Sequence, residues 1–261
     1  MSKRKELRQQ KILEELEAIP TLRIADMARS HKVSTETIRR DLDELTSKGL
    51  LNRTYGGAVR AMNTEPTVTE RHQLFTAERE RIARETVEHI KDAKLLMIGS
   101  GATTVHVARR IACDMKNITV ITHSFGVATV LSMNPTLRVI VAPGEYLASE
   151  GAMTGSQTLL FLRQFTADYT LLGASGLSAG GPSEALIECG TVYHAMQQQA
   201  SKTVVVADHS KFELVFPFNY SGWSGIDTLI TDHIPPDPLR HILSKDRVQL
   251  RIAPHAAVTS E

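Results

Sequence analysis

One stretch near the N-terminus, VSTETIRRDLDEL, constrains the fold most, because its apolar and charged residues separate onto two faces of a helix. Ile38, Leu42 and Leu45 are four and three residues apart, so they form one apolar stripe. Arg39 and Arg40 fall on the remaining surface. A buried stripe with arginines facing away is typical of a helix that lies in the major groove of DNA, although a solvated surface would also explain the two arginines.

The segments around this helix are ordered as in a winged helix-turn-helix. A shorter helix is predicted over Ile24–Ser30 and is followed by a tight turn. After the second helix, Lys48-Gly49 is a stop signal. The runs on either side of Gly56-Gly57 predict a hairpin, which is the wing. A helix over Lys5–Ile19 is expected to buttress these elements, and its basic end either touches phosphates or is solvated.

From this order we expect residues 22–41 to form the helix-turn-helix and polar side chains on it to contact double-stranded DNA. Ser34 is suited to cap the second helix, because its hydroxyl can accept a hydrogen bond from a first-turn amide. Guanidinium and hydroxyl groups can read base edges or hold phosphates. The candidate DNA-binding residues are Ser34, Thr35, Thr37, Arg39 and Arg40 on the helix, and Arg53 and Tyr55 on the wing.

These residues also resemble a known signature. The pattern V-S-x-E-T-I-R-R-D-L-x-x-L-x-x-x-G-L-L-x-R-x-x-G-G-A, present from Val33 to Ala58, is similar to that of the DeoR family of bacterial transcription regulators. Many members have His before the Gly-Gly pair, where this chain has Tyr55. The resemblance implies a DNA-binding head that stands before an effector-binding domain.

Charge divides the chain into two parts. Up to Arg60 there are 13 Lys and Arg against 9 Asp and Glu, and beyond it there are 17 against 20. The positive excess of the first part fits a nucleic-acid-binding module. The polar stretch 61–77 contains Pro66 and has no sustained periodicity, so it predicts an extended linker. We therefore expect a DNA-binding domain over 5–60 and an effector-sensing α/β domain over 78–253.

The second part predicts an α/β fold. A charged helix is expected over Glu78–Ile90, after which short apolar runs alternate with helical segments. Nearly continuous apolar strands in such an alternation predict a mostly parallel sheet with helices on both faces. The predicted strands are Leu95–Ile98, Ile118–Thr122, Leu137–Ala142, Tyr169–Leu172, Thr203–Ala207, Thr228–Ile230 and Val248–Ile252. The predicted helices between and after them are Val105–Ala112, Phe125–Ser132, Gln157–Phe165, Glu188–Gln199 and Leu239–Leu243.

Polar or glycine-rich loops follow four of these strands, where ligands of open α/β sheets bind. The glycines of the loop GSGATT let backbone amides approach a phosphate at a helix N-terminus. Asp208 suits sugar hydroxyls and Lys211 suits a phosphate, with an Asp–Lys pair that braces the loop as the alternative. A lone histidine such as His123 at the end of a strand is more often a hydrogen-bonded structural residue than a ligand or base. The candidate effector-binding residues are Ser100, Gly101, Ala102, Thr103, Thr104, His123, Ser124, Gly173, Ser175, Asp208 and Lys211.

The loops NITVITHS, GASG, ADHSKF and IDTLITD resemble the effector domain that accompanies the DeoR-type head. The resemblance implies a fold related to ribose-5-phosphate isomerase and glucosamine-6-phosphate deaminase. It also implies a sensor for a phosphorylated sugar or sugar-like metabolite, in most cases one that releases repression of a carbohydrate operon. Members often have Asp where Gly99 stands, Ser or Thr where Ala102 stands, and Lys or Arg near Tyr193. These departures indicate an effector other than a common hexose phosphate.

Two other functions stay open at this point. A sugar-phosphate isomerase or deaminase with a DNA-binding head would use Asp208, His209, Glu184 and Lys211 as acid and base groups, but no second carboxylate is recognisably paired with a base. The other is an architectural or activator DNA-binding protein whose second domain binds no small molecule. We expect no catalytic residue, metal or cofactor. We also expect a homodimer or homotetramer, because paired half-sites match a two-fold axis.

The two cysteines, Cys113 and Cys189, are far apart and have no ligand-like neighbours, which is typical of a reduced cytosolic protein. The first residues, MSKRKELRQQ, include basic side chains but no apolar core, so no secretory signal is expected. No apolar run approaches the ~20 residues of a membrane-spanning helix. These features predict a cytoplasmic protein with no membrane partner.

Overall fold

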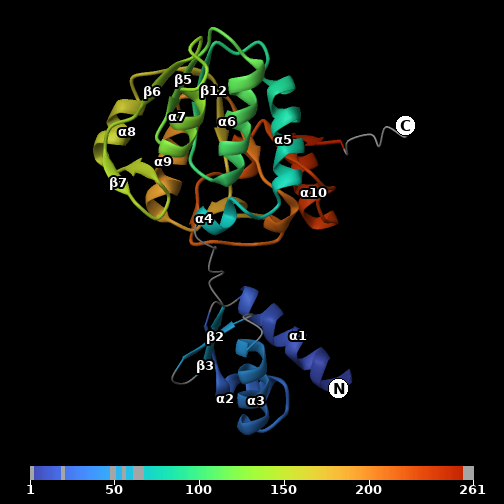
Figure 1. Ribbon diagram of the computed structural model, residues 1–261. Helices are drawn as coiled ribbons and strands as arrows, with labels where there is room; N and C mark the ends of the chain where they lie inside the picture. Colours follow the sequence, from blue (N-terminus) through green and yellow to red (C-terminus); the bar gives the residue numbers. More distant parts are fainter. Residues whose placement is uncertain (1–2, 19–20, 48–50, 55–56, 61–67, 255–261) are drawn as a thin grey trace. The chain divides into compact units, whose positions relative to one another are not determined.

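The computed structural model describes residues 3–18, 21–47, 51–54, 57–60 and 68–254 (Figure 1). The chain divides into two compact units, Met1–Asn63 and Thr64–Glu261. Each unit has a hydrophobic core of its own. In the part of the chain that is described, no helix is long and apolar enough to cross a membrane.

The first unit is a winged helix-turn-helix. Its described elements are α1 (Lys3–Ala18), β1 (Thr21–Arg23), α2 (Ile24–Ser30), α3 (Thr35–Ser47), β2 (Leu51–Thr54) and β3 (Gly57–Arg60). The strands form an antiparallel sheet in the order β1-β3-β2, so β2 and β3 are the predicted wing. Strand β1 was not predicted, because three residues are too few to show an alternation. The predicted stop signal Lys48-Gly49 and the wing tip at 55–56 lie outside the described residues.

The predicted apolar stripe of α3 forms the core of this unit. Ile38, Leu42 and Leu45 are all buried there, packed against residues of α1 and α2. The helix begins as predicted, because the Thr37 amide donates to the Ser34 hydroxyl at 3.1 Å. The helix-turn-helix therefore follows from local sequence.

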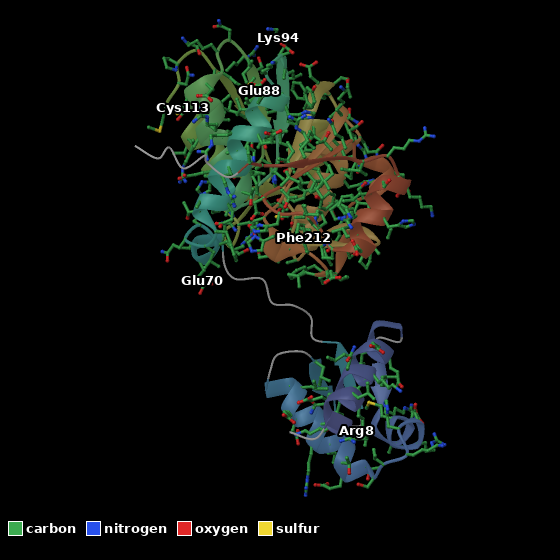
Figure 2. All side chains as sticks on the ribbon, turned by 90° about the vertical axis from the view of Figure 1, so that its right-hand side faces the viewer. Arg8, Glu70, Glu88, Lys94, Cys113 and Phe212 are labelled. Atoms are coloured by element: carbon green, nitrogen blue, oxygen red, sulfur yellow. The ribbon has the colours of Figure 1, made fainter. Side chains whose placement is uncertain are left out.

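The basic end of α1 is used inside the unit. Arg8, labelled in Figure 2, donates from Nε to the buried carboxylate of Asp41 on α3 at 2.5 Å. Lys5 forms an ion pair with Glu44, also on α3. These contacts fix α1 against the recognition helix, which is the buttressing role expected for it.

The second unit is built on a seven-stranded sheet in the order β15-β14-β12-β9-β4-β5-β6, with every pairing parallel. This confirms the predicted fold class, a winged helix-turn-helix followed by a mostly parallel α/β domain. The sheet strands are β4 (Leu95–Ile98), β5 (Thr119–Thr122), β6 (Arg138–Val141), β9 (Ala167–Leu172), β12 (Ala200–Val206), β14 (Thr228–Thr231) and β15 (Gln249–Ile252).

Helices cover both faces of this sheet. On one face lie α5 (Thr76–His89), α6 (Ala102–Asp114) and α7 (Phe125–Leu131), which pack side by side over the residues of the largest core (Figure 1). On the other face lie α8 (Ser156–Leu162), α9 (Ile187–Gln197) and α10 (Asp237–Lys245). Adjacent strand residues such as Leu171 and Leu172 enter opposite cores, which explains why the strands are apolar throughout.

The strand order reverses between β4 and β9. From β4 the chain proceeds outward through β5 to β6, and then β9 returns to the other side of β4 before β12, β14 and β15 follow. Such a reversal leaves a crevice at the carboxyl ends of the two central strands, which is where open α/β sheets bind ligands. The loops after β4 and β9 meet at this point.

Three features of the second unit differ from prediction. Part of the stretch 61–77, expected to be an extended linker, is helical as α4 (Val68–Arg71), because Arg71 is anchored in the domain by an ion pair with Glu150. Helix α6 begins at Ala102 rather than Val105. Short antiparallel strands were missed, since two to four residues carry no periodic signal. They are β7 (Glu145–Leu147), β8 (Ala152–Thr154), β10 (Gly176–Ser178), β11 (Gly181–Glu184) and β13 (Phe218–Asn219).

Candidate functional site

The outer face of α3 presents the predicted DNA-binding side chains to solvent. Arg40 is 79% exposed and Arg39 is 54% exposed. Thr35 is exposed at the first turn, while the Thr37 hydroxyl lies 2.9 Å from that of Ser34. The helix therefore offers two guanidinium groups and short hydroxyls on the face opposite its core.

Both arginines share one carboxylate on the same helix. Glu36 accepts from Nε of Arg40 at 3.3 Å and lies 3.9 Å from Nη1 of Arg39. Exposed pairs of this kind contribute little to stability, so a phosphate or a guanine can displace Glu36 at small cost. Of the two predicted wing residues, Arg53 lies on β2 and its side chain is not described, and Tyr55 lies outside the described residues.

A pocket in the second unit lies at the point where the strand order reverses. It encloses about 310 Å3 of space, part of it open to solvent. Its walls come from the loop after β4, the loop after β9, the start of α5 and the turn after β12. The lining residues are Arg71, Arg79, Ser100, Gly101, Ala102, Thr103, Gly173, Ala174, Glu184, Tyr193 and Lys211.

The loop after β4 is held rigidly at the pocket wall. Its Ser100 amide donates to Nε2 of His123 at 3.0 Å, and its Ser100 carbonyl accepts from the Tyr193 hydroxyl at 2.7 Å. The other nitrogen of His123, Nδ1, lies 2.8 Å from the Met153 carbonyl. Burial lowers the pKa of His123 to about 4, so the ring is neutral near pH 7 and acts as a brace. Gly101 has a φ of 118°, a left-handed conformation that suits glycine, and α6 starts immediately after it.

Three cationic side chains converge on the pocket. Arg71 donates from Nη2 to Glu150 at 2.6 Å, and both side chains are more than nine-tenths buried. Arg79 forms a buried ion pair with Asp208, at 3.1 Å from Nη2 to Oδ2, and also donates to the Arg71 carbonyl. Lys211 lies in the turn after β12. Carboxylates balance this charge, because Glu150 and Asp208 pair with the two arginines and Glu184 also lines the pocket. An anionic group in the pocket would therefore compete with these carboxylates for the cations, and it would also face the N-terminus of α6.

The pocket brings together some of the predicted effector-binding residues but not all. Ser100, Gly101, Ala102, Thr103, Gly173 and Lys211 line it. The other predicted residues have structural partners nearby. The hydroxyl of Thr104 donates to the Gly101 carbonyl, Ser124 caps α7, Ser175 donates to Glu184, His123 braces Ser100, and Asp208 pairs with Arg79.

The pairing of Asp208 corrects two interpretations of its loop. The carboxylate was expected either to bind sugar hydroxyls or to pair with Lys211. It is instead completely buried against Arg79, and its other oxygen accepts from the Ser210 amide at 3.2 Å. Nothing in the sequence around Arg79 marks it as a pocket residue, because it lies on a charged amphipathic helix where most arginines are solvated.

Both parts of the chain match one protein family. Residues 8–64 match the family described as the DeoR-like helix-turn-helix domain, and residues 75–233 match the DeoR C terminal sensor domain. The chain belongs to the DeoR family. The resemblance drawn from Val33 to Ala58 is thereby confirmed, and the second unit is the sensor domain of a DeoR-type transcriptional regulator.

Several relatives of this DeoR-family protein are named as transcriptional repressors. It is 32% identical over 234 residues to the glycerol-3-phosphate regulon repressor of Escherichia coli. The aligned residues cover 87% of this chain and 90% of that repressor. It is 29% identical to the HTH-type transcriptional repressor GlcR of Bacillus subtilis, over 85% and 86% of the two chains. It is 30% identical to the lactose phosphotransferase system repressor of Lactococcus lactis, over 88% and 91%.

Solved structures show a weaker likeness. Ribose 5-phosphate isomerase A from Neisseria gonorrhoeae is 17% identical, covers 51% of this chain and 52% of its own, and superposes with a TM-score of 0.39. The eIF2B delta subunit from Chaetomium thermophilum is also 17% identical, over 78% and 67% of the two chains, with a TM-score of 0.45. Neither likeness bears on what the pocket binds.

Gly99 and Tyr193, two positions at which the sequence departs from the pattern expected for the DeoR family, lie next to each other. A Cβ atom added at Gly99 would lie 2.9 Å from Cε1 of Tyr193, so the tyrosine ring occupies the space that a side chain at position 99 would need. The Tyr193 hydroxyl lies 3.0 Å from that of Ser100. Burial raises the pKa of Tyr193, so this hydroxyl stays protonated. Where family members often carry Asp at one position and Lys or Arg near the other, this chain has an uncharged pair.

One group of side chains outside the pocket has the spacing of metal ligands. Nδ1 of His209 and Nδ1 of His233 each lie 2.6 Å from the same oxygen of Asp232. Arg81 lies 3.7 Å from that oxygen. Both imidazoles are thus within hydrogen-bonding distance of a carboxylate that also has a cation beside it, which makes the group an internal brace between the loops after β12 and β14.

Proposed function

We propose that this DeoR-family protein is a repressor that binds operator DNA through α3 and is controlled by a small phosphorylated metabolite in the sensor pocket. The observation that carries the proposal is the convergence of Arg71, Arg79 and Lys211 with the N-terminus of α6 on one pocket at the strand-order reversal. A phosphate dianion matches this charge better than a neutral sugar does. The names of relatives, including a glycerol-3-phosphate regulon repressor, support the same ligand class.

In this proposal different residues of the pocket bind different groups of the ligand. The loop Ser100–Thr103 and the cations hold the phosphate, because backbone amides and guanidinium groups both donate to its oxygens. Glu184, which is buried and lines the same pocket, accepts from a hydroxyl of the ligand. The uncharged Gly99–Tyr193 pair limits the ligand on that side, which favours a short phosphorylated polyol or sugar acid over a hexose phosphate.

The same residues offer a route to the DNA-binding head. Arg71 is the last residue of α4, the first described helix after the head, and its side chain is bound by Glu150. A phosphate in the pocket competes with Glu150 for this guanidinium, so ligand binding changes how α4 is attached. Ligand affinity and operator affinity are then linked, and each must change the other by the same factor.

The proposal includes no catalytic step. Of the four acid and base groups that an isomerase or deaminase would use, Asp208 is in an ion pair with Arg79 and His209 pairs with Asp232. The other two, Glu184 and Lys211, line the pocket, and in this proposal they bind the ligand. Turnover of a sugar phosphate by the purified protein would contradict this. We also propose a cytoplasmic homodimer or homotetramer, since a repressor with one such head per chain reads paired half-sites.

A thermal-shift screen tests the pocket. Ligands that bind the native state raise its stability by RT ln(1 + [L]/Kd), about 2.7 kcal/mol at a hundredfold excess over Kd. We expect glycerol 3-phosphate or another small phosphorylated polyol or sugar acid to raise the Tm of the full chain, and Lys211→Ala to remove most of the rise. Lys245→Ala, an exposed lysine at the end of α10, is the matched control and should behave as wild type.

The screen separates the proposal from its alternatives. If no phosphorylated compound shifts the Tm, or if Lys211→Ala and Lys245→Ala respond alike, the sensor pocket is wrongly assigned. A compound that shifts the Tm is then added to an operator-binding titration, where it should weaken DNA binding. An unchanged operator affinity would contradict the coupling through α4 while leaving the ligand site intact.

A further inference from the structure

The two edges of the seven-stranded sheet differ in how they are protected. An edge strand presents unpaired backbone groups to other chains, and proteins often place charged side chains on it to prevent pairing. On the β15 edge, Arg251 pairs with Glu85 of α5, and Gln249 is exposed. The other edge strand, β6, has the sequence Arg-Val-Ile-Val, and all four side chains are at least partly exposed. The β6 edge is therefore the more apolar of the two.

The backbone of β6 directs two residues toward this edge. The amides of Arg138 and Ala142 donate to the Ile118 and Thr122 carbonyls on the β5 side. In a parallel ladder every second residue faces the same neighbour, so Val139 and Val141 point their N–H and C=O groups away from β5. No strand lies beyond β6 in the described part of the chain, so these groups are available to another chain.

The centre of β6 is complementary to itself, because Ile140 has a valine on each side. A second copy that pairs antiparallel with β6, about a two-fold axis at Ile140, places Val139 of each copy opposite Val141 of the other. Both valines have outward-pointing backbone groups, so each such pair exchanges both of its hydrogen bonds. Cross-strand pairs of β-branched side chains also stabilise an antiparallel ladder. The strand therefore fits a copy of itself.

Exposed apolar side chains extend this surface beyond the strand. A stable dimer buries about 800 Å2 on each partner, which is more than one short strand provides. Beyond the carboxyl ends of β5 and β6, Phe125 and Tyr146 are 46% and 59% exposed and stack edge to face, with ring centroids 5.3 Å apart. Met133, which is 80% exposed, precedes the amino end of β6. The two-fold axis brings the aromatic pair of one copy toward Met133 of the other, and methionine sulfur packs favourably on aromatic rings.

The charges at the β6 edge are complementary as well. Arg138 starts β6 and Glu145 follows its carboxyl end, and both are exposed with no ion pair in the described part of the chain. Antiparallel pairing places the amino end of one strand beside the carboxyl end of the other. Each Arg138 then approaches Glu145 of the second copy, and opposite charges meet on both sides of the axis.

We propose that the β6 edge is the surface through which the sensor domain binds a second copy of this chain, so that the two sheets join antiparallel across it. The proposal rests on the homo-oligomer proposed above and assigns the surface that forms it. Pro143 keeps the joined segment short, because it is the next outward-facing residue and has no N–H to donate. None of the residues of this surface lines the effector pocket.

A charge placed on each edge of the sheet tests the surface. Val141→Lys puts an ammonium group where the two copies meet, and Ile252→Lys makes the matched change on the β15 edge, where Ile252 is 36% exposed against 40% for Val141. Analytical ultracentrifugation of the full chain gives the assembly mass. We expect wild type and Ile252→Lys to sediment as the same dimer or tetramer, and Val141→Lys to sediment at half that mass. The fluorescence of the buried Trp223 should be unchanged in both variants, which shows that the sensor domain is folded.

Exchange of the two charges tests the antiparallel arrangement. Arg138→Glu and Glu145→Arg each bring like charges together on both sides of the axis, so each should raise the dissociation constant of the assembly by at least about threefold. The double variant Arg138→Glu/Glu145→Arg restores opposite charges across the axis. Its dissociation constant should return to within about twofold of wild type.

The outcomes separate this surface from the proposed function. If Val141→Lys and Ile252→Lys sediment alike, the β6 edge is not the interface, although the homo-oligomer itself stands. If the double charge variant is no closer to wild type than the single variants, the antiparallel arrangement is wrong. A wild-type chain that remains monomeric would contradict both this surface and the homo-oligomer of the proposed function.

Discussion

On α3, the candidate DNA-contacting side chains are consecutive in sequence and exposed, whereas the sensor pocket collects buried side chains from segments up to 140 residues apart, from Arg71 to Lys211. The α3 face needs only a capped amphipathic helix. The pocket needs the strand order, the Arg79–Asp208 pair and the His123 brace to be in place first. A change at the buried ion pairs of the pocket should therefore disturb folding, and a change on the exposed face of α3 should disturb binding.

Arg79→Ala should have the largest effect. It leaves Asp208 buried without its cation, which costs about 3–5 kcal/mol of the free energy of unfolding. Trp223 is the sole tryptophan of the chain and is buried in the sensor domain, so its fluorescence during denaturation reports this unit alone. Arg84→Ala, an exposed position on the same helix, should change stability by less than about 0.5 kcal/mol. If both variants lost the same free energy of unfolding, the expected difference between buried and exposed charges would be wrong.

Arg40→Ala should have the next largest effect, and only on DNA binding. It should weaken operator affinity by about 1–3 kcal/mol if Arg40 makes a bidentate contact to a guanine. Fluorescence anisotropy at a fixed salt concentration measures the operator affinity. Arg29→Ala, on the preceding helix, is the control. The unfolding curve followed by Trp223 fluorescence should be unchanged. A loss of equal size on operator and random DNA would assign Arg40 to phosphates instead.

Substitutions at Ser34 test whether one residue both caps α3 and contacts DNA. Ser34→Ala should remove the cap of α3 at a cost of about 1 kcal/mol, which appears as roughly fivefold faster hydrogen exchange of the α3 amides. Ser34→Asp should retain the cap but weaken DNA binding by repelling phosphates. If Ser34→Asp binds DNA as wild type does, Ser34 is a cap only and lies away from the backbone of the duplex.

Local periodicity in the sequence was enough to predict the winged helix and the parallel sheet, but it could not predict about half of the residues that line the pocket. Periodicity is a local signal, so the stripe of α3 and the apolar strands are visible in single segments. Arg71 and Arg79 acquire their roles from Glu150 and Asp208, which are far away in sequence, and nothing near the two arginines distinguishes them from solvated charges. Loops after strands were good guides because topology alone brings them together. Asp208 was expected to face a ligand, since the helix that pairs with it could not be placed from sequence.

The relation between Gly99 and Tyr193 could not be derived from the chain either. The two positions are 94 residues apart, and only the structure shows that the Tyr193 ring fills the space beside Gly99, 2.9 Å from where a Cβ atom at position 99 would lie. A carboxylate introduced at position 99 alone would lie against the tyrosine ring. A side chain introduced at position 99 therefore requires Tyr193 to shift or to be replaced.

The carboxylate of Glu36 has a consequence for how this protein behaves at different ionic strengths. Binding to DNA releases condensed cations, and the number released sets how steeply affinity falls as salt rises. Because Arg39 and Arg40 already have Glu36 beside them, contact with a phosphate exchanges one anion for another, and the net neutralisation per arginine is smaller. We therefore expect α3 to bind nonspecific DNA more weakly, and we expect its affinity for a matched operator to depend less on salt concentration.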